Sequence, residues 1–371
     1  MSRLDVYVDR SPLVGALEVV SLTVGGPDRL YGGMTGAHGH LFFRYELGTG
    51  PGGRGGRFVD LGDRVVSAPT IISFSGNPIP GKIHHALETL PDGRIAGATG
   101  QNYSVSGLYT DRDEGGHVFI YDPTRDASED LGVPCPHEWL FNLTMDPAGE
   151  NLYAMTYPLN HVVRVDLRRG SMRVVGQPPA KTWGDSGPCH QCCTDDDGRV
   201  FGSGLHRHIW MYDPRRDVLE ATAMRLPEGA ERIDSFVRGP DRKLYAGTWE
   251  RGDLLRIDPA TLTLDVLGCP GGGPRLPALA WRGDGCLYGA AGGGRAYQTR
   301  SAFIFRYDPR TERIEEIGPI ESAEQGVTGE RIHTMVCGPD GRLYCGETGG
   351  TQIKAGEVAM NPNLYVCTVR D

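Results

Sequence analysis

The chain has 371 residues, of which 39% are hydrophobic and 23% charged, so it can bury a large core and does not have the composition of a disordered chain. Its 54 glycines and 26 prolines favour many short elements joined by turns over long helices. The formal net charge of -9 would repel a phosphate backbone, which argues against nucleic acid as a partner.

The beginning of the chain has no apolar run behind a basic start, and no stretch of about 18 apolar residues occurs anywhere. We therefore expect no membrane partner and no export. The 9 cysteines are an odd number, and three of them crowd into 189–193, which is not the spacing of a disulfide-stapled secreted domain. These features predict a protein of the reducing cytoplasm.

One phrase recurs along the chain: a short apolar run, then Pro-Asp-Gly or a related turn, then Leu-Tyr or a similar pair. Such turns are typical of hairpins because Gly and Asp tolerate positive φ. In chain order the copies occupy 27–32, 91–95, 147–153, 197–202, 240–245, 284–289 and 339–344. Each copy is followed by an alternating strand that often ends in Tyr-Asp-Pro, and these strands are predicted over 40–47, 117–123, 161–167, 208–214, 253–259, 303–309 and 363–369.

A period of about 40–50 residues with several short strands in each unit is typical of propeller blades. The sequence therefore predicts an all-β, seven-bladed β-propeller in a single domain spanning 1–371. The predicted blades cover approximately 14–66, 82–134, 137–177, 188–227, 231–270, 274–319 and 328–371. The last blade is one strand short, and 3–8 is a spare strand at the other end. Pairing the two would close the ring and remove two exposed sheet edges.

Equivalent positions of the blades can be compared because the repeats align with one another. The residue near the start of each innermost strand is, in blade order, Ser21, His85, Phe141, His190, Asp234, Pro277 and His333. Inner strands of a propeller begin around the central channel. Three imidazoles and one carboxylate, distant in the sequence, are therefore predicted to face one small volume.

The loops after each second strand return to the same face of the predicted ring. They carry aromatic and cationic side chains, of which the ligand-binding candidates are Tyr103, Arg207, Trp249 and Arg251, with Tyr157 as a catalytic candidate. This mixture suits a funnel for a small anionic or sugar-like ligand.

Two chemistries fit these residues. In the first, His85, His190, Asp234 and His333 bind a divalent metal such as Mn, Fe, Zn or Ni, with Ca as a further candidate. In the second, no metal takes part. His85 or His190 removes a proton, Tyr157 donates one, and an arginine neutralises a substrate carboxylate, which is the arrangement that β-elimination requires.

The seven blades and the inner-strand histidine in Lys82-Ile83-His84-His85 resemble the propeller polysaccharide lyases, including the ulvan lyases and the rhamnose–glucuronate lyases. The resemblance covers the whole chain in architecture, although its motifs are general to propellers. It implies a lyase of uronate-containing oligosaccharides, with His85 as base or neutraliser, Tyr157 as acid or base and Arg164 near the carboxylate. Those lyases have a second histidine shortly after the first hairpin of blade two, where this chain has Gln101-Asn102-Tyr103.

Two other functions stay open at this stage. Metal-centred propeller enzymes, such as the oligogalacturonate lyases and the iron-dependent carotenoid oxygenases, also use a ring of histidines, but this column lacks a fourth. A propeller that binds a ligand or protein without any chemistry is the other alternative, because this fold commonly presents its loops to partners.

Overall fold

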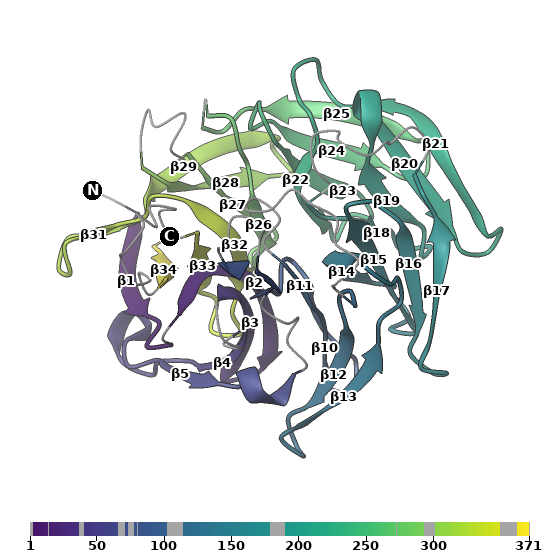
Figure 1. The fold of residues 1–371 in the computed structure, drawn as a ribbon. Helices are drawn as coiled ribbons and strands as arrows, with labels where there is room; N and C mark the ends of the chain where they lie inside the picture. Colours follow the sequence, from purple (N-terminus) through teal and green to yellow (C-terminus); the bar gives the residue numbers. More distant parts are fainter. Residues whose placement is uncertain are drawn as a thin grey trace.

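Seven antiparallel sheets, six of four strands and one of six, surround a common axis in the computed structural model (Figure 1). The structure describes residues 3–13, 15–36, 41–65, 71–72, 78–79, 81–101, 114–178, 190–271, 273–292, 301–348 and 362–370. The predicted all-β, seven-bladed architecture is confirmed. In the described part of the chain, no helix has the length and apolar character needed to cross a membrane.

The first three blades are formed by the strands between residues 16 and 176. Blade one contains β2 (Ala16–Gly26), β3 (Arg29–Gly36), β4 (Phe42–Glu46) and β5 (Arg57–Asp60), extended by β8 (Gly81–Lys82) and β11 (Gly100–Gln101). Blade two contains β9 (Leu87–Thr89), β10 (Ile95–Ala98), β12 (Val118–Asp122) and β13 (Ala127–Gly132). Blade three contains β14 (Trp139–Met145), β15 (Asn151–Tyr157), β16 (Val162–Asp166) and β17 (Ser171–Gly176).

Blades four to six repeat the same order of strands. Blade four contains β18 (Cys193–Thr194), β19 (Val200–Ser203), β20 (His208–Asp213) and β21 (Val218–Arg225). Blade five contains β22 (Ile233–Arg238), β23 (Leu244–Thr248), β24 (Leu254–Asp258) and β25 (Thr263–Gly268). Blade six contains β26 (Ala278–Trp281), β27 (Leu287–Ala291), β28 (Phe303–Asp308) and β29 (Arg313–Pro319).

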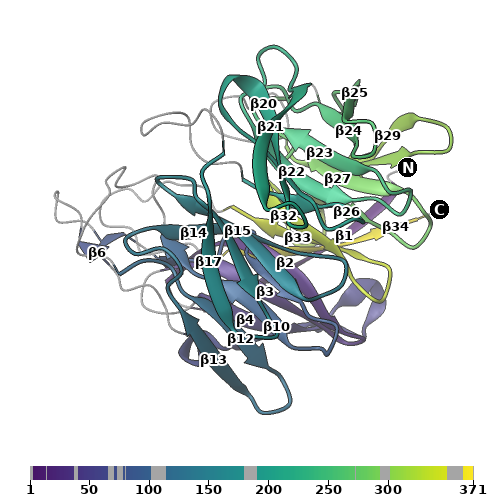
Figure 2. The same ribbon diagram turned by 90° about the vertical axis from the view of Figure 1, so that its right-hand side faces the viewer.

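Blade seven is built from both ends of the chain. It contains β32 (Ile332–Cys337), β33 (Leu343–Glu347) and β34 (Asn363–Val369), and its outermost strand is β1 (Leu4–Arg10). β1 pairs antiparallel with β34 in a continuous register from Leu4 opposite Val369 to Arg10 opposite Asn363. The two ends of the chain lie close together in both views (Figure 1, Figure 2). The predicted closure by the N-terminal strand is confirmed.

A few short elements lie outside the seven sheets. They are the strand pairs β6 (Ile71–Ile72) with β7 (Pro78–Ile79) and β30 (Glu321–Ser322) with β31 (Val327–Thr328), and the 3-10 turns η1 (Pro51–Gly53), η2 (Gly62–Arg64) and η4 (Leu205–Arg207).

The recurring phrase of the sequence has a structural cause in its Asp and Tyr residues. In blade seven the hydroxyl of Tyr344 donates to Asp340 Oδ2 at 2.7 Å, and the other oxygen of Asp340 accepts from the backbone N–H of Arg342 at 3.1 Å. Tyr245 with Asp241 and Tyr288 with Asp284 make the same hydroxyl bond. The repeated carboxylates therefore hold the hairpin turns and are not part of a functional site.

Tyrosines of the second and third strands fill four of the interfaces between blades. The tyrosine of a second strand packs against the tyrosine from the third strand of the adjacent blade, with ring centroids 5.7–6.0 Å apart. The pairs are Tyr31–Tyr121, Tyr153–Tyr212, Tyr245–Tyr307 and Tyr344–Tyr45. All of these rings are fully buried. Large aromatic rings thus fill these four blade-to-blade interfaces.

The innermost strands form a closed ring around the axis. Each one contacts the innermost strands of the two adjacent blades, in the order β2, β9, β14, β18, β22, β26, β32 and back to β2. Residues at the beginnings of these strands therefore meet at one end of the channel, and this geometry positions the site described next.

Candidate functional site

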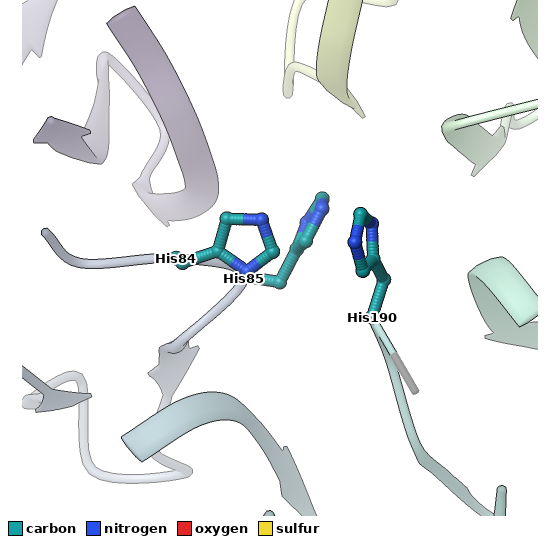
Figure 3. A group of neighbouring side chains, drawn as sticks. All are labelled: His84, His85 and His190. Carbon is teal, nitrogen blue, oxygen red and sulfur yellow. The ribbon is translucent and has the colours of Figure 1, made fainter. Parts of the chain in front are cut away.

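Four histidines converge where the inner strands begin. His84 and His85 precede β9, His190 precedes β18, and His333 is the second residue of β32. The ring centroids of His85 and His333 are 4.7 Å apart, those of His84 and His190 are 5.2 Å apart, and all four side chains are buried. Figure 3 shows the rings of His84, His85 and His190 turned toward one another. The structure thus brings together the three predicted histidines and adds a fourth.

Both His84 and His85 face the axis because the backbone departs from the alternation of a strand. His85 has a φ of 47°, in the left-handed region that residues other than glycine rarely adopt. Its N–H donates to Val20 O at 3.2 Å and its carbonyl accepts from Leu143 N at 3.0 Å, so blades one, two and three fix this conformation together. Unusual backbone geometry of this kind clusters at functional sites.

The hydrogen bonds of His84 and His333 fix the positions of their protons. His84 Nδ1 lies 2.9 Å from the carbonyl of Phe141, which can only accept, so Nδ1 carries the proton and Nε2 carries a lone pair. His333 Nε2 lies 2.7 Å from His84 Nε2 and donates to it. Burial and the nearby charge of Lys82 hold the pKa of His84 well below its ordinary value, and burial does the same for His333.

The tautomer of His85 is fixed through a glutamine. Phe236 N–H donates to Gln191 Oε1 at 2.7 Å, so the amide NH₂ of Gln191 must face His85 Nδ1, which it does at 2.7 Å. Nδ1 of His85 therefore accepts, and its proton is on Nε2, a buried atom that has no hydrogen-bond partner among the described residues. Burial lowers the pKa of His85 to about 3, so the ring is neutral at physiological pH.

This arrangement corrects the expectation that His85 removes a proton from a substrate. A neutral imidazole whose Nε2 is already protonated can only donate from that atom. Lowering of the pKa by burial is how a neutral histidine becomes a donor to a developing negative charge.

His190 is oriented by a buried ion pair. Its Nδ1 lies 2.9 Å from Asp234 Oδ1, and Arg275 binds both oxygens of Asp234, with Nη2–Oδ1 at 2.7 Å and Nε–Oδ2 at 2.9 Å. Asp234 is 0% exposed. The Asp234 carboxylate lies beside Nδ1 of His190 without a hydrogen bond of ordinary geometry, so it acts on this ring through its charge. Because both oxygens of Asp234 are occupied, it positions His190 from behind, which corrects its prediction as a metal ligand.

Cations and an indole ring surround the four histidines. The guanidinium carbon of Arg275 lies 3.6 Å from the centroid of the Trp249 ring and that of Arg232 lies 4.2 Å from it, and Trp249 itself packs edge-on to His190 at 5.0 Å. Lys82 is buried and lies 3.6 Å from Glu18. Their positive charges contribute to the depressed histidine pKa values and favour an anionic ligand.

The structure places the other predicted residues at different distances from this centre. Trp249 contacts it directly. The ring of Tyr157 packs on Trp139 at 5.8 Å and lies 6.4 Å from that of Phe141, which contacts His84, so Tyr157 is one ring removed from the histidines.

The predicted arginines have partners elsewhere. Arg207 donates to Leu226 O at 3.1 Å, Arg251 to Asp253 Oδ2 at 2.6 Å, and Arg164 to Asn151 Oδ1 at 2.9 Å. None of the hydrogen bonds that these arginines make among the described residues reaches the histidine cluster. Tyr103 lies outside the described residues.

Sequence reasoning missed His84, Gln191 and Arg275. The first two had a signal, since each is adjacent to a histidine of the predicted column. Arg275 had none, because its role depends on a contact with Asp234, 41 positions away.

The imidazoles can accept a metal ion with little rearrangement. The ligand nitrogens of His84, His85 and His190 all lie within 4.8 Å of one another. Nδ1 of His84 donates to the carbonyl of Phe141, and Nδ1 of His190 lies beside the Asp234 carboxylate. This is the outer-shell pattern of metal-binding histidines. His84 and His190 thus have the outer partners that a metal-binding histidine needs, and Nε2 of His84 would have to exchange its contact with His333 for the ion.

Comparisons with known proteins agree on architecture alone. No family model matches the chain, and no curated protein sequence is similar to it. Among solved structures, a streptogramin B lyase superposes with a TM-score of 0.65 at 11% identity, covering 99% of this chain and 98% of that one. The chain is a seven-bladed β-propeller.

Two further structures extend this result. A catalytically inactive histidine-to-alanine variant of virginiamycin B lyase from Staphylococcus aureus, with quinupristin, gives a TM-score of 0.62 at 12% identity over 98% of this chain and 99% of that one. The extracellular domain of a putative hybrid two-component system from B. thetaiotaomicron gives 0.60 at 12% identity, and this propeller spans 39% of that chain. None of these three is a polysaccharide lyase, so the resemblance stated above has support only at the level of the fold.

Proposed function

We propose that the axial histidines form a divalent-metal centre and that the propeller is a metal-dependent lyase acting on a small anionic substrate. One observation carries this proposal: the ring nitrogens of His84, His85 and His190 lie within 4.8 Å of one another in a buried space, and neither nitrogen of His190 has a hydrogen-bond partner among the described residues. Burying several neutral bases together is unfavourable unless something binds to their lone pairs.

The donor set decides between the candidate metals. Imidazole nitrogen suits Zn, Fe, Mn and Ni, whereas Ca is bound by six to eight oxygens. The two carboxylates described near the centre already have partners, because Asp234 accepts from Arg275 and Glu18 accepts from Thr35. We therefore propose a transition metal and not Ca.

The surrounding residues fit a negatively charged substrate. Arg275 and Lys82 supply positive charge, and Trp249 offers an aromatic wall beside His190. A bound metal would polarise a substrate oxygen. The Nε2–H of His85 would stabilise negative charge on an oxygen polarised in this way. Two of the similar structures are lyases by name, and in one of them replacement of a histidine abolishes catalysis.

The uronate-containing oligosaccharides expected from the sequence stay a prediction within this class, as does a cytoplasmic location. Elimination across a uronate creates a C=C bond that absorbs in the ultraviolet. Incubation of the metal-loaded protein with uronate oligosaccharides, with other carboxylated sugars as comparison, tests that narrower prediction.

Metal analysis tests whether the axial histidines bind a metal ion. Purified protein is loaded in turn with Zn, Mn, Fe and Ni, dialysed, and analysed for bound metal. We expect the double variant His84→Ala, His190→Ala to hold one ion per chain fewer than the unchanged protein. His206→Asn, which removes an exposed imidazole in η4, is the control and should bind as much as the unchanged protein. Equal metal content in the double variant and the unchanged protein would refute the centre.

The positive charges around the axial histidines also favour a second function, which is the binding of an anionic ligand without catalysis. If anionic sugars bind at the centre with or without metal and no product forms with any of them, the propeller is a binding module. Calorimetric titration of the unchanged protein and of Arg275→Met with the same oligosaccharides distinguishes this outcome.

A further inference from the structure

A second group of metal-ligating side chains lies in blade three, apart from the axial histidines. Cys135 and Glu138 belong to the segment between β13 and β14, and His161 lies between β15 and β16. Cys135 Sγ is 3.0 Å from Glu138 Oε1 and 3.6 Å from His161 Nδ1, and His161 Nδ1 is 2.7 Å from Glu138 Oε1. A thiol, a carboxylate and an imidazole thus face one point.

Backbone contacts hold this trio in place. Glu138 N–H donates to Cys135 O at 3.2 Å, and Gly116 N–H donates to Glu138 O at 2.8 Å. The hydroxyl of Thr156 donates to Glu138 Oε2 and accepts from His161 N–H at 2.8 Å. The second oxygen of Glu138 is therefore held by an outer residue, in the manner of a metal-binding carboxylate.

The geometry excludes a nucleophile–histidine–acid relay. Such a relay needs the nucleophile on one imidazole nitrogen and the acid on the other. Here the sulfur and the carboxylate oxygen both approach Nδ1 of His161, and the sulfur also contacts the carboxylate directly. Three ligand atoms around one point are the arrangement of a coordination site.

We propose that Cys135, Glu138 and His161 form a second metal site, for Zn²⁺ or a similar thiophilic divalent ion. A tetrahedral zinc with bonds of about 2.3 Å to sulfur and about 2.0–2.1 Å to nitrogen or oxygen separates sulfur from nitrogen by roughly 3.6 Å and nitrogen from oxygen by roughly 3.3 Å. The observed distance from Sγ to Nδ1 is 3.6 Å.

The carboxylate lies closer than zinc coordination requires because it accepts the protons of both partners. On binding, the thiol proton leaves to solvent. The Nδ1 proton of His161 is also lost, and Nε2 takes one up from water, so one proton is released for each metal bound. Glu138 Oε1 moves outward by about half an ångström to give the ligand separations above. Cys135 and Glu138 are 8% and 2% exposed, whereas the side chain of His161 is 23% exposed, which leaves a path to a fourth position.

Cobalt substitution tests this site independently of the axial centre. A thiolate bound to Co²⁺ gives an intense sulfur-to-metal charge-transfer band, which an all-imidazole centre does not give. We expect the full chain titrated with Co²⁺ to develop this band, with one proton released per ion, and Zn²⁺ to abolish it by displacement.

Three variants test whether the band arises from Cys135 at the proposed site. Cys135→Ser should lose the band, and so should His161→Gln, which changes a partly exposed side chain if the first variant fails to fold. Cys269→Ser removes an exposed thiol and should retain the band, as should the axial double variant. No band in the unchanged protein, or loss of the band only in Cys269→Ser, would overturn the proposal. Loss of the band together with retention of axial metal would leave the proposed function intact.

Discussion

Neutral histidines at the axis should make the folded protein sensitive to acid. His85 has a pKa of about 3 in the folded state and about 6.5 in an unfolded chain. Below pH 6.5 the unfolded chain binds a proton that the folded state does not, so stability is full above that pH and is lost as the pH falls. At pH 5 the loss from His85 alone is about 1.5 × 1.36, or about 2 kcal/mol, and at pH 4 about 3.4 kcal/mol.

The other three imidazoles act in the same direction. The pKa values of His84, His190 and His333 are also held well below the ordinary value. Typical domains are stable by only about 5–15 kcal/mol. We therefore expect cooperative unfolding of the metal-free protein in mild acid, where a propeller without such a cluster would stay folded.

Urea unfolding at several pH values, in the presence of a chelator, measures this effect. His85→Asn is the informative variant, because asparagine tolerates the positive φ and does not titrate. Its stability should fall less steeply between pH 6 and 4, by about 1.4 kcal/mol per pH unit, which is the contribution of one proton. His206→Asn is the matched control, since His206 is exposed and also has a positive φ of 52°. If His85→Asn and the unchanged protein have the same slope, the reasoning is wrong.

Three further predictions concern single positions. Arg242 occupies, with a φ of 65°, the turn position that is glycine in blades two, four, six and seven, so Arg242→Gly should raise the free energy of unfolding by about 1 kcal/mol in a denaturant titration. Burial raises the pKa of Glu88 to about 7, so the folded state loses stability between pH 4.5 and 7, and Glu88→Gln should be more stable by about 1–3 kcal/mol at pH 8 but not at pH 4. Asp234→Asn leaves Arg275 buried without its counter-charge, so it should cost about 3–5 kcal/mol in urea unfolding and weaken metal binding in titrations by about 10–100-fold.

The fold could be predicted from the sequence because each blade encodes its own turn. Asp340 and Tyr344 are four residues apart, and the hydrogen bond between their side chains fixes the hairpin without help from other blades. A local device repeated at a regular interval is visible in the sequence. The convergence of His85, His190 and His333 followed from the same repeat, since equivalent positions of successive blades surround the axis.

The chemistry of the site could be predicted only in part. His84 was missed because strand alternation would turn it away from the channel, and only the left-handed backbone at His85 brings it in. The donor role of His85 depends on Gln191 and on the N–H of Phe236, 45 positions further along the chain. Proton positions are set by such contacts between blades, which no repeat encodes.

The group of Cys135, Glu138 and His161 could not be predicted from the sequence for a different reason. Among the cysteines, the Cys189/Cys192 spacing attracts attention in the sequence, whereas Cys135 stands alone in it. Its partner His161 lies 26 positions away, beyond a complete hairpin. Only the pairing of β14 with β15 and of β15 with β16 brings the two loops together.

The register between β1 and β34 also has a kinetic consequence. Leu4 is synthesised long before its partner Val369, which lies 365 positions further along the chain. The first six blades can each form from contiguous chain as it leaves the ribosome, but the seventh must wait, with its first strand already made and unpaired. Completion of the ring therefore depends on the pairing of β1 with β34, whose residues are far apart in the sequence. Such contacts form slowly because a long loop must be closed. Until that moment β1 is open to capture by another nascent copy, so assembly of the last blade is the step at which exchange of strands between copies competes with correct folding.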